Sequence, residues 1–374
     1  MLDSFYLTLL IGPTVPLPAP RPVVEALTSA QVTVSSGQQS GFQLTFGLSK
    51  KSLLQNVLLP AGYFDPTMRV ILMVTVKGIP YVLMDGVITQ QQLTPSNEPG
   101  QSTLTVTGED LTRMMDLVDL TGTPMPAMPA EARVSLILSR YAMFGIVPLV
   151  IPSMLPEVPN PMEQIPSQHG TDLAYIQELA EDVGYVFYLQ AGPAPGMNLA
   201  YWGPEVKVGL PQPALTVNLD SATNVESLSF SYDGFSKALY ILRIQLPEDP
   251  PVAIPIPLPD IGPLNPPLGL KPIPPLRTET LDTAPNTAIQ AAARGMARAS
   301  QSADAISGSG QLDVLRYGRV LQARQLVSVR GVGLTYDGFY FVKSVTHNIK
   351  QGEYKQSFSL TRNAQVAFAP VVIP

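Results

Sequence analysis

A three-strand pattern occurs near the start of the chain and again near its end. Each copy consists of apolar runs rich in β-branched residues, separated by turns or loops with Gly, Asp or Pro. The runs are residues 69–76, 81–89 and 102–107 in the first copy, and 325–330, 339–349 and 354–362 in the second. Such runs and turns indicate antiparallel strands that follow one another along the chain. The repetition predicts a duplicated β-barrel.

Charge is scarce in this chain. Of its 374 residues, 45% are hydrophobic and only 14% are charged, compared with roughly a quarter in an average soluble protein. We therefore expect a subunit whose surface is covered by partners, with a free monomer of low charge as the alternative. The net charge of −6 argues against a nucleic-acid binding site, which needs cations to neutralise phosphates.

Cysteine is absent, which excludes disulfides, thiolate metal sites and cysteine nucleophiles. The apolar residues 5–11 resemble a signal peptide, but Asp3 stands where a basic residue belongs, and no cleavage site follows. We read this stretch as a strand. No proline-free run of 18 apolar residues occurs, so no transmembrane helix and no membrane insertion are expected. The predicted location is the cytoplasm during assembly, followed by a larger particle.

Helical spacing interrupts the β pattern in the middle of the chain. A short helix is predicted at residues 108–116, a second from Pro129 to a stop at Gly145, and a third that Thr171 caps and that ends before Gly184. The following aromatic strand, residues 185–189, is predicted to form a hairpin with residues 197–202.

Residues 247–277 contain 12 prolines. Because proline lacks an N–H group and fixes φ, this segment is predicted to be an extended arm, mostly without helix or sheet. It contains Ile and Leu residues, so it could pack on a neighbouring subunit or on its own barrel, or remain a free loop. Packing on a neighbour is the prediction. The Ala-rich residues 286–306 are predicted to form a helix that stops at a Ser/Gly run, residues 307–310.

These patterns predict a mainly β fold with some α structure (α+β) and three domains. A first β-barrel domain covers residues 1–120, and small α/β domains cover 121–212. A second β-barrel domain covers 213–374, with the proline-rich arm at 247–277 and the helix at 286–306 inserted into it.

Few residues could carry chemistry. Ser167, His169 and Asp172 are neighbours in sequence, but a catalytic triad is defined by spatial geometry, and capping of the helix explains them better. His347 lies in a predicted strand and is expected to be a structural or interface residue. The glycines of residues 330–336 lack the third glycine of a dinucleotide site. We therefore assign no catalytic, cofactor-binding or metal-binding residue, and expect no cofactor and no enzymatic activity.

Three segments together resemble the phage late control gene D proteins, which are related to the hub part of the VgrG spike proteins of type VI secretion. Residues 170–188 resemble the helix, glycine and aromatic strand of that family. Residues 331–347 resemble its closing segment, and residues 81–110 more loosely match the end of its first barrel. The proline-rich arm is an insertion relative to this pattern.

The resemblance implies a baseplate hub: a homotrimeric ring of two tube-like barrel domains per subunit, between a six-fold inner tube and a three-fold spike. The expected partners are the tube protein, other baseplate proteins and a spike encoded separately, because no spike domain follows the last strand. Either a phage tail or an extracellular contractile injection system fits. The alternatives are a tail-associated enzyme that degrades cell wall, and a β-rich adhesin or carbohydrate-binding tail protein.

Overall fold

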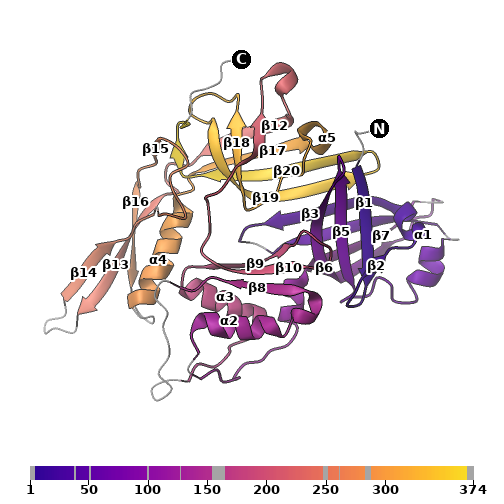
Figure 1. Ribbon diagram of the computed structural model, residues 1–374, viewed down its shortest axis with the longest axis horizontal. Coiled ribbons are helices and arrows are strands. Elements are labelled where there is room, and N and C mark those ends of the chain that lie inside the picture. Colours follow the sequence, from indigo (N-terminus) through magenta and orange to yellow (C-terminus); the bar gives the residue numbers. More distant parts are fainter. Residues whose placement is uncertain are drawn as a thin grey trace.

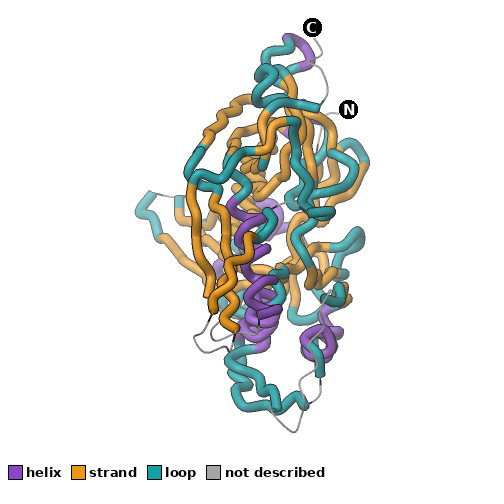
Figure 2. The backbone as a smooth tube through the Cα atoms, turned by 90° about the vertical axis from the view of Figure 1, so that its left-hand side faces the viewer, coloured by secondary structure: helices purple, strands orange, loops and turns teal. Residues whose placement is uncertain are grey.

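The computed structural model describes residues 5–37, 39–49, 52–98, 101–126, 128–153, 165–246, 252–260, 262–282 and 288–368. Strands dominate, and helices accompany them in smaller number (Figure 1). Figure 2, turned by 90°, shows most of the helical segments in the lower half of the molecule, flanked by strands. The prediction of a mainly β fold with some α structure is confirmed.

The first β unit is a meander in which strands far apart in sequence also pair. Its strand order is β3-β4-β7-β6-β5-β1-β2. The strands are β1 (Phe5–Gly12), β2 (Leu17–Pro18), β3 (Leu27–Ser35), β4 (Gly41–Leu48), β5 (Arg69–Val76), β6 (Ile79–Thr94) and β7 (Ser102–Asp110), with helix α1 (Arg21–Ala26) and the π-helix η1 (Leu54–Leu58) between them. In β4 and β7 nearly every second residue is buried, as the alternation of side chains along a strand requires.

The second β unit has the strand order β12-β17-β20-β19-β18-β11. Its strands are β11 (Gln212–Thr216), β12 (Val225–Tyr232), β17 (Ile306–Asp313), β18 (Leu326–Arg330), β19 (Gly338–Lys350) and β20 (Glu353–Arg362), with the short helices η4 (Asp220–Ala222) and α5 (Val314–Tyr317). The predicted meanders β5-β6-β7 and β18-β19-β20 are both confirmed as antiparallel.

The two units share their strand arrangement in detail. The order β3-β4-β7-β6-β5 corresponds to β12-β17-β20-β19-β18, although the next strand is antiparallel in the first unit and parallel in the second. The β-bulges also correspond. They lie between Ile88 and Gln90 in β6, Val342 and Ser344 in β19, Leu27 and Ser29 in β3, and Val225 and Ser227 in β12. Two residues before β5 and β18, Thr67 and Arg324 both have positive φ.

One long strand joins the two units. The first residues of β19 pair with β18, and its later residues, beyond the bulge, pair with β3. Both units therefore belong to one 13-stranded sheet (Figure 1). One hydrophobic core contains buried residues from both units. Neither unit closes into a barrel within the described residues, so the expectation of two barrels is wrong in this respect. The reason is that the edge of β19 that could close the second unit is occupied by β3.

A smaller α/β unit lies between the β units in sequence. It contains η2 (Leu111–Asp116), α2 (Ala130–Ser139), η3 (Ala142–Phe144), β8 (Ile146–Val150), α3 (Asp172–Asp182), β9 (Val186–Ala191) and β10 (Asn198–Gly203). Its sheet has the order β8-β10-β9, and β9 and β10 form the predicted antiparallel pair. Thr171 caps α3 by accepting a hydrogen bond from the Ala174 N–H, as predicted. The helix predicted from Pro129 ends earlier, at Ser139, and a 3₁₀ turn continues to Gly145.

The proline-rich segment contains more β structure than predicted. Strand β14 (Val252–Pro257) pairs with β13 (Ala238–Leu246), which pairs with β16 (Arg277–Asp282); β15 (Lys271–Pro272) pairs with β21 (Ala364–Gln365). Pro255 and Pro257 have the same orientation in β14, so their missing N–H groups can share its free edge. Helix α4 (Ala288–Ser302) confirms the Ala-rich helix, but its predicted Ser/Gly stop is the start of β17.

Residues 258–260 and 262–273 of this segment pack on the protein itself. Leu258 is buried beside α4, Leu268 is buried with Leu326 and Phe341, and Ile273 belongs to the main core. Of the three possibilities left by the sequence, packing on its own chain is the one that this part of the segment adopts. Residues 247–251 and 261 lie outside the described residues.

Candidate assembly interface

The Asp172 carboxylate is a structural anchor of the α/β unit. It is buried at the start of α3 and accepts hydrogen bonds from Arg140 Nη1 at 3.0 Å, Tyr141 Oη at 2.8 Å and Gln168 Nε2 at 2.7 Å. Burial, together with the hydrogen bond to Asp172, raises the pKa of Tyr141. Asp172 thus ties α3 to the end of α2.

His169 lies away from this carboxylate cluster. Its side chain is largely exposed, and its Nδ1 atom is 3.8 Å from Glu178 Oε2 on α3. Ser167 forms an isolated backbone bridge with Pro124. The structure therefore explains the three sequence neighbours as parts of a helix entry, and it does not arrange them as a proton relay.

His347 is a buried core residue of β19. Its Nδ1 atom is 2.8 Å from Tyr354 Oη and 3.2 Å from Gln356 Nε2, both on β20. Burial lowers the pKa of His347 to about 3. Of the two predicted roles, structural or interface, the burial supports the structural one.

A cavity of about 540 Å³ lies between the first β unit and the α/β unit. Its lining combines apolar side chains with Tyr81 and the amides of Gln190, Asn198 and Gln322. Among the described residues, no group of three or more His, Cys, Asp and Glu side chains is placed to hold a metal ion. No helix in this part of the chain is long and apolar enough to cross a membrane.

Arg69 joins the first β unit to the α/β unit. Its guanidinium makes two hydrogen bonds to Asp85, 2.8 Å from Nε and 2.7 Å from Nη2, and both side chains are almost completely buried. Nη2 also donates to the carbonyl oxygen of Phe144 at 2.8 Å. Asn198 of β10 donates to the same carboxylate at 2.7 Å. The pair is fully desolvated and satisfied by bonds from both units, the condition under which a buried ion pair is tolerated.

Arg324 contacts all three units. Its backbone belongs to the segment before β18, and its guanidinium carbon lies 3.8 Å from the centre of the Tyr188 ring on β9. Nη1 donates to the Leu189 carbonyl at 3.2 Å, and Nη2 donates to the Ser35 carbonyl, at the end of β3, at 2.6 Å. This single side chain fixes the α/β unit at the place where β3 meets β19.

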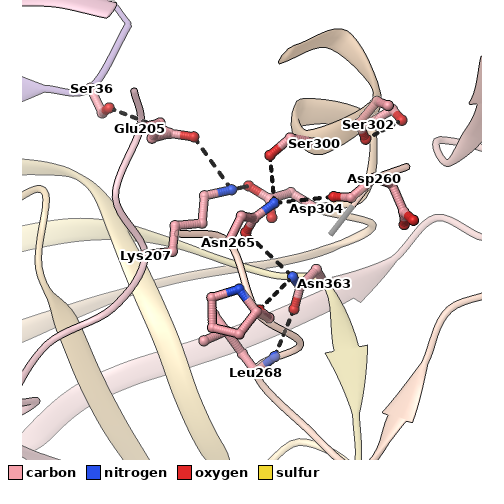
Figure 3. A network of polar contacts seen from close by, with 12 residues as sticks. Ser36, Glu205, Lys207, Asp260, Asn265, Leu268, Ser300, Ser302, Asp304 and Asn363 are labelled. Carbon is pink, nitrogen blue, oxygen red and sulfur yellow. Dashed lines mark hydrogen bonds and ion pairs between the residues drawn. The ribbon is translucent and has the colours of Figure 1, made fainter. Parts of the chain in front are cut away.

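A second buried network surrounds Lys207, in the segment that enters the second β unit (Figure 3). Its ammonium lies 2.7 Å from Asp304 Oδ2 and 3.4 Å from Glu205 Oε2, and Glu205 accepts a hydrogen bond from Ser36 at 3.1 Å. Burial alone would lower the pKa of Lys207, but the charges of Asp304 and Glu205 raise it. The network links the end of β3 to the turn between α4 and β17.

Two asparagines hold the proline-rich segment in place (Figure 3). Asn363, directly after β20, accepts a hydrogen bond from the Leu268 N–H at 2.8 Å and donates to the Pro266 carbonyl at 3.0 Å. Asn265 bonds to Ser300 of α4. The side-chain amides thus replace the ladder bonds that a proline-rich chain cannot form.

Sequence reasoning did not find these junction residues. Arg69, Lys207 and Arg324 bind Asp85, Asp304 and the Ser35 carbonyl, which lie 16, 97 and 289 positions away in the sequence. No spacing rule relates such partners. The available signal was the scarcity of charge, because an ionic side chain in an apolar setting is often buried with a partner.

Among the strand edges that remain open in the described part of the chain, two belong to matched strands of the two β units. The last residues of β6, from Gln90 to Thr94, pair only with β7, and all five are exposed. Strand β12 pairs only with β17, and most of its residues are exposed. Free edges present unpaired N–H and C=O groups that can accept another strand.

Comparisons with solved structures find the same fold in phage tail and type VI secretion proteins. A 43 kDa tail protein of prophage MuSo2 from Shewanella oneidensis is 15% identical with a TM-score of 0.62, covering 97% of this chain and 100% of that one. A tail protein from Neisseria meningitidis is 14% identical with a TM-score of 0.59, covering 96% of both chains. A chain of the Francisella PdpA–VgrG complex is 10% identical with a TM-score of 0.58, covering 99% of this chain and 54% of that one.

No protein-family model matches the sequence, and no curated protein is significantly similar to it in sequence. The likeness therefore lies in the fold. The fold is that of phage tail proteins and of VgrG-related proteins.

Proposed function

We propose that this protein is the structural central hub of a contractile tail baseplate, in a phage tail or an extracellular contractile injection system. Three copies form a ring that adapts a six-fold inner tube to a three-fold spike made by a separate protein. The first and second β units, within residues 1–120 and 213–374, face the tube, and the α/β unit within residues 121–212 lies beside them. The protein acts through its binding surfaces, without a cofactor and without catalysis.

The observation that carries this proposal is the matched pair of β units. Five strands follow in the same order in both, with bulges at corresponding positions. Two similar units in each of three subunits present six similar edges, which relieves a mismatch between three-fold and six-fold symmetry. The similarity of the fold to phage tail proteins over nearly the whole chain supports the same role.

The test is the mass of the protein in solution, alone and with the tube protein of the same particle. The expected result is a trimer of the 40.2 kDa chain that also binds the end of the tube. A monomer that does not bind the tube contradicts the proposal, and so does an assembled particle with one copy for each of six tube protomers. Purified protein that hydrolyses cell wall, or binds carbohydrate without joining the tube, supports the enzyme or adhesin instead.

A further inference from the structure

The contact between the two β units inside one chain has a defined strand register. Beyond its bulge, β19 runs antiparallel to β3, with Thr346 opposite Thr33. The hydroxyl oxygens of these two threonines are 3.1 Å apart. At the bulge itself, the Ser36 N–H donates to the Lys343 carbonyl at 2.8 Å. This junction shows how one unit of this kind joins the next.

The matched bulges identify the equivalent positions in the strands that remain unpaired. Strand β6 corresponds to β19. The first paired residues beyond their bulges are Gln90 and Ser344, so Gln92 is the equivalent of Thr346. Strand β12 corresponds to β3. Ser231 lies four residues after Ser227, the first paired position beyond the bulge of β12, as Thr33 lies four residues after Ser29 in β3, so Ser231 is the equivalent of Thr33. Leu93 and Phe230 follow as the equivalents of His347 and Val32.

Within one chain these two edges are not paired with each other. Strands β17, β20, β19, β3, β4 and β7 lie between β12 and β6 along the sheet. Strand β19 binds β3 through one of its edges. The equivalent edge of β6 is free and exposed, and so is the outer edge of β12. Each chain therefore contains one such junction, between β19 and β3, and two strand edges, on β6 and β12, that are equivalent to the two sides of that junction but are not paired.

We propose that the second half of β6 in one copy pairs antiparallel with β12 of the next copy, in the register of the β19–β3 junction. Gln92 lies opposite Ser231, and Leu93 lies opposite Phe230. The Gly234 N–H donates to the Thr89 carbonyl, as Ser36 does to Lys343. This inference rests on the proposed ring, for which it names the contact between subunits.

The side chains at these positions suit such a contact. Leu93 is 45% exposed in the single chain. In the existing junction the corresponding pair is His347, equivalent to Leu93, opposite Val32, equivalent to Phe230, and both of these residues are buried. Pairing would cover Leu93 against Phe230, which already stacks on Tyr336 in the second unit. The two named pairs are uncharged, and the one charged side chain that this register places opposite residues 90–94, Asp233, lies opposite the neutral amide of Gln90. A head-to-tail contact of this kind uses two different edges, and it closes into a ring when the rotation allows.

Engineered disulfides test the register, because the natural chain has no cysteine. The double variant Gln92→Cys with Ser231→Cys is purified, oxidised and run on a non-reducing gel. The expected products are covalent dimers and trimers that a reductant converts to single chains. The double variant Thr33→Cys with Thr346→Cys is the matched control within one chain: it should form its disulfide and still run as a single chain.

The register-shifted variant Gln91→Cys with Ser231→Cys places the thiols on opposite faces of the sheet, so it should not cross-link. Equal cross-linking in this variant overturns the pairing, because it indicates random collision. Trimers without the Gln92–Ser231 cross-link overturn the pairing but leave the proposed hub intact. A chain that stays monomeric and does not cross-link contradicts the pairing and the trimer together.

A second variant checks the contact without cysteine. Leu93→Lys adds a charge at an exposed position, so each chain should fold normally while the trimer dissociates. Leu210→Lys, at a side chain that is 94% exposed outside both edges, is the control and should remain trimeric. A Leu93→Lys protein that folds and still forms trimers contradicts the pairing.

Discussion

Several of the buried charges in this sparsely charged protein lie where its units meet. Arg69 connects the first β unit to the α/β unit, and Arg324 connects both to the second β unit. Each guanidinium offers several donors in a fixed plane, so one side chain can satisfy carbonyl groups from separate units. The chain uses its few charges to fix relative positions.

Replacing Arg69 with Leu should destabilise the protein by about 3–5 kcal/mol, because it leaves the Asp85 carboxylate buried without its partner. Denaturant unfolding of the purified variant measures this. The double variant Arg69→Leu with Asp85→Leu should recover part of the loss. The matched control is Arg21→Ala, whose ion pair with Glu25 is exposed and whose removal should cause no measurable loss. Similar losses for Arg69→Leu and Arg21→Ala would contradict the assigned role.

His347 should make stability depend on pH. Burial holds its folded pKa at about 3, below the ordinary value of 6.5, so the unfolded chain binds a proton that the folded chain rejects. Its contribution is therefore complete above pH 6.5 and is lost as the pH falls towards 3, by up to about 1.4 kcal/mol per pH unit. Unfolding curves of the wild type and of His347→Gln between pH 7 and pH 4.5 measure the difference. Parallel pH dependences in the two proteins would show that His347 does not contribute.

At the scale of elements, hydrogen-bond geometry explains where proline is tolerated. In β14 the alternate prolines leave the other residues free to pair with β13. Beyond β14, side-chain amides and buried Leu and Ile residues hold the chain on its own cores. The segment is thus an integrated part of the second half of the protein.

Leu268 and Leu270 provide a matched test of this integration. Leu268 is 4% exposed and packs with Leu326 and Phe341, whereas Leu270 is 61% exposed. Leu268→Ala should cost about 2–5 kcal/mol of unfolding free energy, and Leu270→Ala less than about 0.5 kcal/mol. Denaturation midpoints compare the two variants. Equal effects would mean that the segment does not depend on this packing.

At the scale of the whole molecule, the two β units form one body. They share a continuous sheet through β19 and β3, and they share one core. Ring contacts such as Phe5 with Tyr354, at 5.4 Å between centroids, connect the first strand of one unit to the last meander of the other. A rigid pair of this kind would present two tube-facing units at a fixed angle, which the proposed ring requires.

The sequence by itself determined most of the elements. Periodic apolar runs located both meanders, Thr171 marked the start of α3, and the Ala-rich stretch located α4, because these signals depend on neighbours a few residues apart. The absence of a recognisable catalytic motif also left surfaces as the candidate site.

Only the tertiary structure decided how the elements combine. The pairing of β19 with β3 joins residues about 300 positions apart, and the register of that pairing follows from packing, which local propensity does not encode. The same holds for Arg69, Lys207 and Arg324, whose partners are close only after folding. For this reason the sequence predicted two barrels and a proline-rich arm packed on a neighbouring subunit. Folding produced one shared sheet and packed residues 258–260 and 262–273 of that segment on their own chain.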